Sequence, residues 1–209
     1  MNFFNDLENY SNNTAIVTES SDHISYMDLL DIADSIGEHI KKRCLVFFVC
    51  NNCFESIAGY IGFLRAGTVL SLIQDTIDNT LLANLIEIYK PEYIYLPTKN
   101  LGLQFNGTIV HTYGSYMLLK TVQNIDYTLH KDLALLLTTS GSTGSPKFVR
   151  QSYKNINSNA EAIALYLGIT STDRPISTMP MNYTFMLSII NSHFLKGASI
   201  ILTNATLME

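Results

Sequence analysis

The chain alternates short apolar runs with longer segments whose apolar residues recur every three or four positions. The runs Leu45–Val49, Val69–Ile73 and Leu133–Leu137 contain no charged residue, which is typical of strands buried on both faces of a sheet. Segments such as Phe54–Leu64 place their apolar residues on one helical face. Because parallel strands need helical crossovers, this alternation predicts an α/β fold with a parallel sheet layered with helices.

The same patterns locate the remaining elements. Further strands are predicted at Ala15–Thr18, Tyr93–Leu96 and Ser199–Leu202, and further helices over 26–40, 82–89, 153–167 and 189–195. Ser25, with Asp28 three residues later, fits a capping box at the start of the first helix, and Gly67 and Pro91 mark the ends of the next two. Residues 97–131 carry scattered glycines and are expected to form turns and edge strands.

The ten residues after the run Leu133–Leu137 are nearly all small, hydroxylated or glycine. They are Thr138–Lys147, with the sequence TTSGSTGSPK. Glycine allows left-handed torsions, so successive N–H groups can converge on an anion, and the hydroxyls and Lys147 supply further donors. We therefore predict an anion-binding loop between a strand and a helix, with a polyphosphate as its ligand.

Two other interpretations of this loop are weaker. A mobile Gly/Ser linker has a similar composition, but linkers do not usually interrupt a buried strand and an amphipathic helix within one domain. The P-loop of nucleoside triphosphatases requires glycine directly before its lysine and serine or threonine directly after it. Here Pro146 and Phe148 flank Lys147, so that motif is absent.

The loop closely resembles the phosphate-binding signature of the AMP-forming acyl and aminoacyl adenylate synthetases, the AMP-dependent synthetase/ligase family. That signature is Thr-Ser-Gly-Ser-Thr-Gly, any residue, Pro-Lys, and Thr139–Lys147 reproduces it without a gap. In the family this loop holds the β- and γ-phosphates of ATP. The resemblance therefore implies the same role for Thr139, Ser140, Gly141, Ser142, Thr143, Gly144 and Lys147.

Shorter elements are similar to the same family. Residues 25–29, SYMDL, resemble its Thr-Tyr-x-Glu-Leu element, and Leu64–Gly67 resembles its Leu-Lys-Ala-Gly element; both are interpreted as packing elements. Pro180 and its neighbours resemble the Pro-x-x-His-x-x-Gly element that opens the wall of the family's carboxylate-substrate pocket. In this chain Tyr183 stands where an aromatic residue or histidine is expected, and Met186 stands where glycine is expected.

These departures concern the acyl pocket. Tyr183 and Met186 are candidate pocket residues, and methionine fills volume that glycine leaves free. Core packing of both side chains is the alternative. Phe148 also stands where the family usually has glycine, and Tyr153 where it commonly has histidine. We therefore expect an acyl pocket or a loop that differs from the family pattern.

The resemblance implies an ATP-dependent ligase reaction in two steps. The carboxylate of a small carboxylic or amino acid attacks the α-phosphorus of ATP, giving acyl-AMP and pyrophosphate, while Mg²⁺ offsets the developing charge. The thiol of coenzyme A or of a carrier protein's phosphopantetheine then takes the acyl group. The sequence does not identify the acid or the thiol.

Members of this family are more than twice as long as this chain of 209 residues. Their remaining part supplies the adenine pocket, the Mg²⁺-binding acidic residue, the ribose-binding aspartate and a mobile domain with the catalytic lysine. We interpret the chain as an incomplete N-terminal AMP-binding domain, with a first α/β portion at about 1–131 and a phosphate-loop portion at 132–209. We expect no complete catalytic set and little activity from it alone, which leaves a non-catalytic binding or scaffold fragment as an alternative.

Composition narrows the expected partners and compartment. The net charge is −5, and the basic cluster Lys41–Arg43 sits near a predicted helix end, where cations suit the helix dipole. Nucleic-acid binding is therefore not expected. The sequence has no apolar run of about 18 residues and no basic-then-apolar leader, so we expect no membrane span and a cytoplasmic location.

The cysteines suggest a rival function. Cys50 and Cys53 form a C-x-x-C between a strand and a helix, the context of thioredoxin-like redox sites, where a helix N-terminus lowers the pKa of a thiol. Simple packing of two small side chains is the alternative. The histidines show no spacing typical of metal-ligand pairs, so no metal site is predicted, and His111 and His130 are interpreted as core or surface residues.

Overall fold

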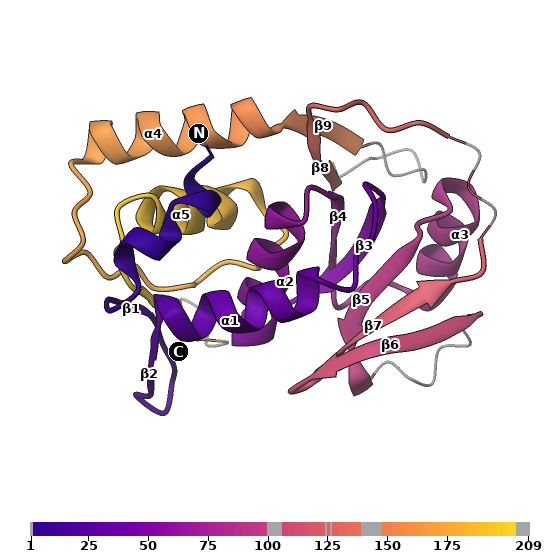
Figure 1. The fold of residues 1–209 in the computed structure, drawn as a ribbon, viewed down its shortest axis with the longest axis horizontal. Coiled ribbons are helices and arrows are strands. Elements are labelled where there is room, and N and C mark those ends of the chain that lie inside the picture. Colours follow the sequence, from indigo (N-terminus) through magenta and orange to yellow (C-terminus); the bar gives the residue numbers. More distant parts are fainter. Residues whose placement is uncertain (1, 100–105, 124, 126, 139–147, 204–209) are drawn as a thin grey trace.

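The computed structural model describes residues 2–99, 106–123, 125, 127–138 and 148–203. Within these residues, seven strands form a large sheet in the order β6-β7-β5-β3-β4-β8-β9, and three strands form a small sheet. Helices pack on both faces of the large sheet (Figure 1). The α/β architecture expected from the alternating pattern is therefore confirmed.

The centre of the large sheet is parallel. Its strands, in spatial order, are β5 (Tyr93–Pro97), β3 (Leu45–Cys50), β4 (Val69–Gln74) and β8 (Leu133–Thr138). Helix α2 (Phe54–Arg65) connects β3 to β4, and helix α3 (Asn79–Tyr89) connects β4 to β5. The two helices join separate apolar clusters, because successive residues of β3 point to opposite faces of the sheet.

Antiparallel strands extend the large sheet at both edges. The hairpin of β6 (Gly107–Tyr113) and β7 (Tyr116–Thr121) continues it beyond β5, and β9 (Phe148–Ser152) pairs with β8. Strand β6 lies at an edge as expected for this region, whereas β7 is an interior strand with mostly buried residues. The large sheet thus contains strands from both sides of position 131.

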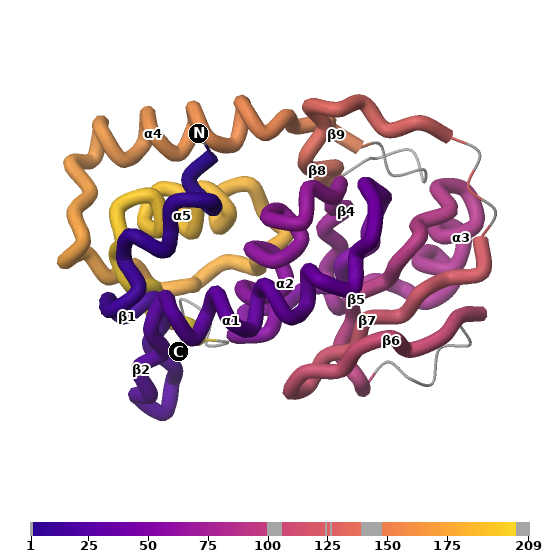
Figure 2. Tube along the Cα trace, viewed as in Figure 1, coloured from indigo at the N-terminus to yellow at the C-terminus, as the bar shows by residue number. Residues whose placement is uncertain are grey.

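The small sheet joins distant parts of the chain. Two short 3₁₀ helices (Phe3–Asn5 and Leu7–Tyr10) precede β1 (Thr14–Val17), which pairs antiparallel with β2 (His23–Ser25) and parallel with β10 (Ile200–Ile201). Figure 2 shows the indigo start of the chain on the same side of the molecule as its yellow end.

Helix α1 (Tyr26–Gly37) begins with the capping box that the sequence predicts. The Ser25 hydroxyl accepts a hydrogen bond from the backbone N–H of Asp28 at 3.1 Å, and the Asp28 carboxylate accepts one from the Ser25 N–H at 3.2 Å. The helix crosses α2 closely, because a Cβ atom added at Gly62 would lie only 2.1 Å from the backbone oxygen of Ala33.

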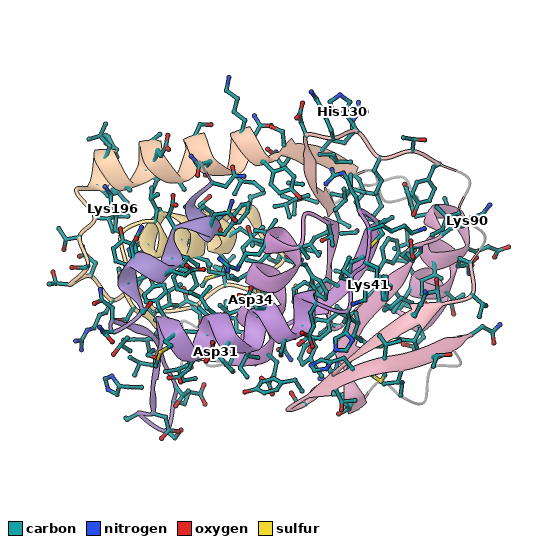
Figure 3. The ribbon with its side chains drawn as sticks, in the orientation of Figure 1. Asp31, Asp34, Lys41, Lys90, His130 and Lys196 are labelled. Carbon is teal, nitrogen blue, oxygen red and sulfur yellow. The ribbon has the colours of Figure 1, made fainter. Side chains whose placement is uncertain are left out.

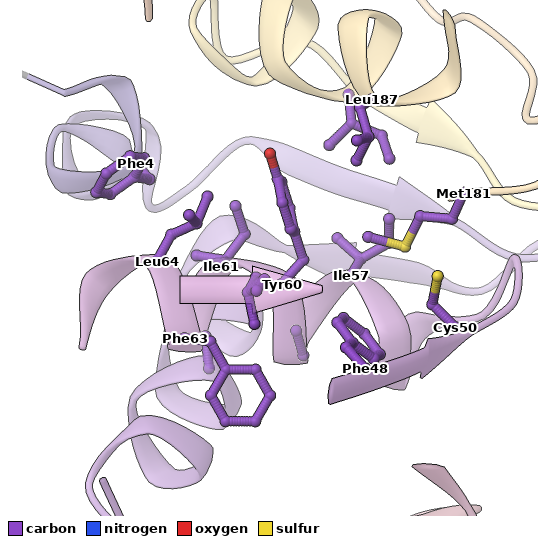
Figure 4. Close-up of a cluster of buried hydrophobic side chains, with 14 of the residues drawn as sticks. Phe4, Phe48, Cys50, Ile57, Tyr60, Ile61, Phe63, Leu64, Met181 and Leu187 are labelled. Atoms are coloured by element: carbon purple, nitrogen blue, oxygen red, sulfur yellow. The ribbon is translucent and has the colours of Figure 1, made fainter. Parts of the chain in front are cut away.

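The larger apolar cluster lies between α1, α2, the sheet and α5 (Thr184–Phe194), and α4 (Tyr153–Leu167) joins it through Ile156. Figure 4 shows Tyr60 standing between the α2 residues Ile57 and Ile61, with its hydroxyl directed toward the helix that carries Leu187. This cluster fixes α5 over the carboxyl ends of the parallel strands. No helix within the described residues combines the length and apolarity that crossing a bilayer requires.

Candidate functional site at the carboxyl edge of the sheet

The predicted phosphate loop, residues 139–147, lies outside the described residues, but both of its ends are placed. Strand β8 ends at Thr138 beside β4, with Leu72 in register with Leu137. Strand β9 then starts at Phe148, which pairs with Thr138. The loop is therefore anchored at the carboxyl edge of the parallel strands, the edge at which open α/β sheets bind their ligands.

The element after the loop differs from the prediction. The sequence indicated a strand, a loop and a helix, whereas β9 lies between the loop and α4. The sequence of β9, FVRQS, is mostly polar. This fits its surroundings, since three of its residues are half-buried and two are exposed. A strand of this kind lacks the apolar run that identifies buried strands.

A cavity of about 440 Å³ lies between α4, α5 and the β8–β9 pair, and we call it the helix cavity. Four of its lining side chains are aliphatic, and the other seven carry amides or hydroxyls. The lining residues are Leu135, Leu137, Gln151, Asn155, Ile156, Ser158, Asn159, Thr184, Leu187, Ser188 and Asn191.

A second cavity, of about 380 Å³, opens beside the end of β4, and we call it the sheet-edge cavity. Leu137 and Thr184 line both cavities, so the two adjoin at the strand end from which the loop leaves. The Oδ1 atom of Asn182 is buried there without a hydrogen-bond partner among the described residues. The other lining residues are Ile73, Gln74, Thr76, Ile77, Leu81, Leu85, Thr138 and Tyr183.

The two candidate pocket residues have different environments. Tyr183 precedes the first residue of α5, is 46% exposed and lines the sheet-edge cavity. Met186 is 1% exposed, belongs to the larger apolar cluster and lines neither cavity. For Met186 the structure therefore matches the packing alternative that the sequence left open.

The other two departures from the family pattern also make packing contacts. Phe148 meets the ring of Tyr89 on α3 edge-on, with 4.8 Å between the ring centroids. Tyr153, the first residue of α4, donates a hydrogen bond from its hydroxyl to the backbone oxygen of Thr68 at 2.7 Å. Both aromatic residues thus tie the elements after the loop to the rest of the domain.

The described lining residues of both cavities include no charged side chain. In the part of the chain that the structure describes, no cluster of three or more histidine, cysteine, aspartate or glutamate residues could hold a metal ion. The cavities supply hydrogen bonds and apolar contact.

Sequence reasoning missed the polar residues of the helix cavity. Thr184, Ser188 and Asn191 recur at helical spacing along α5, a helix whose other residues are mostly apolar. On α4, Asn155, Ser158 and Asn159 form a matching stripe. The sequence did contain a signal for this cavity, namely a polar stripe on the otherwise apolar helix α5. Such a stripe places hydrogen-bonding groups on a helix face that packs against the rest of the protein.

The thiol-redox alternative conflicts with the environment of its cysteines. Burial raises the pKa of Cys50, and it raises the pKa of Cys53 to about 11. Both thiols are free, and the Cys53 thiol donates to the hydroxyl of Ser56. A redox site needs a lowered thiol pKa, so the prediction drawn from the C-x-x-C spacing is wrong on this point.

His111 has a partner that the sequence did not reveal. Its Nδ1 atom lies 3.1 Å from Nε2 of His39, and the two ring centroids are 4.6 Å apart. Burial, followed by the nearby His39, lowers the pKa of His111. His130 is exposed and lies near Asp132, with 3.8 Å between Nδ1 and Oδ2. The histidine pair lies on β6 and beyond α1, away from both cavities.

Two curated relatives match parts of the chain. The 2-succinylbenzoate–CoA ligase of Bacillus velezensis is 37% identical over 76 residues, which are 36% of this chain and 16% of the ligase. The corresponding ligase of Bacillus subtilis is 38% identical over 69 residues, which are 33% of this chain and 14% of that protein. The matched segments thus span a small part of each relative.

Solved structures match nearly the whole chain. Apo MatB from Rhodopseudomonas palustris superposes with a TM-score of 0.79 at 20% identity, covering 97% of this chain and 45% of MatB. MatB with bound ATP gives the same TM-score at 21% identity. VinN in complex with 3-methylaspartate gives 0.75 at 18% identity, covering 97% of this chain and 61% of VinN. At these identities the likeness establishes the fold.

A sequence model described as "AMP-binding enzyme" matches residues 3–208, nearly the full chain. This match includes the loop residues 139–147 and both helices that line the helix cavity. The fold and the family match agree, and the chain therefore belongs to the AMP-binding enzyme family of adenylate-forming synthetases and ligases.

Proposed function

We propose that this chain forms the phosphate-binding and acyl-binding part of an enzyme that adenylates a carboxylic acid with ATP. The observation that carries the proposal is the position of the two residues that flank the signature loop, Thr138 and Phe148, which pair with each other beside two cavities. A triphosphate bound by the loop would lie at the carboxyl edge of the sheet. An acid in the adjoining helix cavity would then have its carboxylate close to that triphosphate.

The proposed reaction transfers AMP to the acid. A carboxylate oxygen bonds to the α-phosphorus of ATP, and the bond to the β,γ-pyrophosphate breaks. We assign Thr139, Ser140, Gly141, Ser142, Thr143, Gly144 and Lys147 to hold the leaving pyrophosphate through N–H groups, hydroxyls and one cation. Positioning the two reactants in line is the main contribution of such a site.

The second step of the proposal transfers the acyl group to a thiol, from coenzyme A or a carrier protein. It is supported by the relatives named as CoA ligases and by a structural neighbour that is a four-domain nonribosomal peptide synthetase bound to AMP and glycine. The sheet-edge cavity, with Tyr183 at its rim, is a candidate route by which a thiol reaches the acyl-adenylate.

The proposal includes the two portions at about 1–131 and 132–209, and it places the remaining catalytic groups outside this chain. We accordingly expect the 209-residue chain to bind nucleotide but to turn it over slowly or not at all. A non-catalytic binding fragment is the second candidate. ATP–pyrophosphate exchange that depends on added acid, measured on a longer chain of the same protein, separates the two functions.

The first test of the proposal replaces Lys147 by alanine. Because lysine supplies the one full positive charge in the loop, we expect Lys147→Ala to weaken ATP and pyrophosphate binding at least about tenfold. Isothermal titration calorimetry measures this change. Lys196→Ala is the matched control, since Lys196 is exposed and Figure 3 shows it at the left end of the molecule, away from β8 and β9. Equal binding by both variants would contradict the phosphate assignment.

A further inference from the structure

The helix cavity has an unusual lining for a site that accepts an acyl group. Seven of its eleven described lining residues are amides or hydroxyls, and none carries a charge. The aliphatic residues Leu135, Leu137, Ile156 and Leu187 complete the lining. Of these polar residues Asn191 is buried and Gln151 and Ser188 are half-buried, whereas Asn155, Ser158, Asn159 and Thr184 are exposed. A purely alkyl guest would displace water from the three more buried side chains and leave their polar groups without partners, which is unfavourable.

The side-chain amide of Asn191 is held in one orientation. The residue is 5% exposed, and its Oδ1 accepts a hydrogen bond from the Tyr60 hydroxyl at 3.1 Å. Burial raises the pKa of Tyr60, so the hydroxyl stays protonated and donates. Within the part of the chain that is described, the hydrogen bonds of Asn191 use Oδ1, which leaves its Nδ2 donors for an acceptor in the adjoining cavity.

Ser188 and Asn159 face each other across the same cavity. The Ser188 hydroxyl lies 2.9 Å from the Thr184 backbone oxygen and 3.3 Å from Oδ1 of Asn159. A hydroxyl has one proton, so it donates to only one of these oxygens at a time. When it bonds to the backbone, the Asn159 amide presents both an acceptor and donors to a guest. The cavity thus offers donors and acceptors together.

From this lining we infer that the helix cavity selects a small acyl group whose far end carries an uncharged hydrogen-bonding group, a hydroxyl or a carboxamide. The inference rests on the proposed function, which places the acid in this cavity. A distal carboxylate or ammonium group placed against Asn191 and the buried aliphatic residues would lose water with no opposite charge among the described lining residues, which is unfavourable. A neutral hydroxyl or carboxamide satisfies the amides without that cost.

The test compares five acids with four-carbon chains that differ only in the far end. Butanoate, 4-hydroxybutanoate, succinamate, succinate and 4-aminobutanoate are titrated into the 209-residue chain, and binding is followed by ligand-observed NMR. We expect 4-hydroxybutanoate and succinamate to bind at least about tenfold more tightly than the other three. Tightest binding of butanoate or of a charged acid, or no binding by any of the five, would overturn the inference.

A charge introduced into the cavity provides a second readout. Asn159→Asp adds an anion to the lining, and we expect it to shift the preference toward the cationic 4-aminobutanoate by about tenfold. Leu165→Asp adds the same charge on the same helix at a position that is 84% exposed and lines neither cavity. If both variants change the preference equally, the acid does not occupy the helix cavity.

The two proposals fail in different ways. ATP binding that is lost in Lys147→Ala, together with no selectivity among the acids, would leave the phosphate site standing and remove the inference about the acyl group. Selectivity among the acids without any nucleotide binding would retain the cavity assignment and remove the proposed adenylation.

Discussion

The guanidinium group of Arg43 joins two backbone segments, the turn at Gly67 and the turn from His130 to Leu133. Its Nη1 donates to the backbone oxygen of Gly67 at 2.5 Å, and its Nη2 donates to the oxygens of His130, at 2.7 Å, and Leu133. The ring of Tyr153 packs beside the guanidinium carbon, 5.8 Å from the ring centroid. A planar fork of donors can satisfy several carbonyls at once, which a single ammonium cannot do. Arg43 therefore has a structural role that reading the basic cluster as a helix-end feature did not anticipate.

Arg43→Lys tests this role. Lysine keeps the charge but cannot reach three carbonyl oxygens in this arrangement, so we expect the free energy of unfolding to fall by about 1–3 kcal/mol. Urea denaturation measures the change. Lys41→Arg, the reverse exchange at an exposed neighbour two residues away, should stay within about 0.5 kcal/mol of the parent. A loss of similar size in both variants would contradict the assigned role.

The pair of His39 and His111 gives the protein a defined response to acid. Because the pKa of His111 is lowered in the folded state, the unfolded chain binds more protons as the pH falls through the ordinary value of 6.5. The free energy of unfolding is therefore highest above this pH and decreases as the pH falls below it. We expect His111→Asn to lose less stability than the parent between about pH 7 and about pH 5. The exposed His130→Asn should follow the parent, and a flattened profile for that control would point to another group.

At the scale of elements, the sequence predicted what local chemistry determines. The capping box at Ser25 and the unbroken apolar strands β3, β4 and β8 are confirmed, because burial on both faces and helix capping leave clear patterns. Strands β2 and β9 were missed because they are short and largely polar and depend on pairing with a neighbour. The two cavities were also missed, because they need helices from separate parts of the chain to converge.

The crossing of α1 and α2 depends on glycine. A side chain at Gly62 would meet the backbone oxygen of Ala33, which cannot move without shifting α1. We expect Gly62→Ala to lower the free energy of unfolding by about 1–3 kcal/mol or more, since overpacking forces the helices apart. Thermal or urea unfolding measures this loss. Adding Ala33→Gly to this variant should not restore stability, because the added methyl group clashes with the backbone oxygen of residue 33. Full restoration would show that the side chain of Ala33 was responsible.

At the scale of the whole molecule, Asn52 links the large sheet to the segment that leads into the small one. Its Nδ2 donates to the backbone oxygens of Ser177 at 3.1 Å and Met179 at 3.0 Å, and it lies 3.5 Å from that of Thr203. Asn52 lies two residues after the end of β3 at Cys50, so a single amide near the sheet edge positions the chain on either side of α5. The helix cavity depends on this attachment because α5 forms one of its walls.

We expect Asn52→Ala to loosen this attachment without unfolding the sheet. Hydrogen–deuterium exchange should increase in residues 176–181 and 200–203, while β5 and β7 keep the protection of the parent. Asn79→Ala, at an exposed asparagine in the first turn of α3, should leave all four segments unchanged. A uniform increase across the large sheet would instead mean that Asn52 supports the global fold.

The small sheet can form completely only when β10 is available to pair with β1. Ile16 lies in register with Ile200, so β1 finds its parallel neighbour only after the long segment between the two strands has emerged from the ribosome. Until then, β1 presents an open edge that can pair with other chains. Contacts this distant in sequence form slowly. The small sheet can therefore close only after β10 is made, and until then the open edge of β1 is exposed to pairing with other chains.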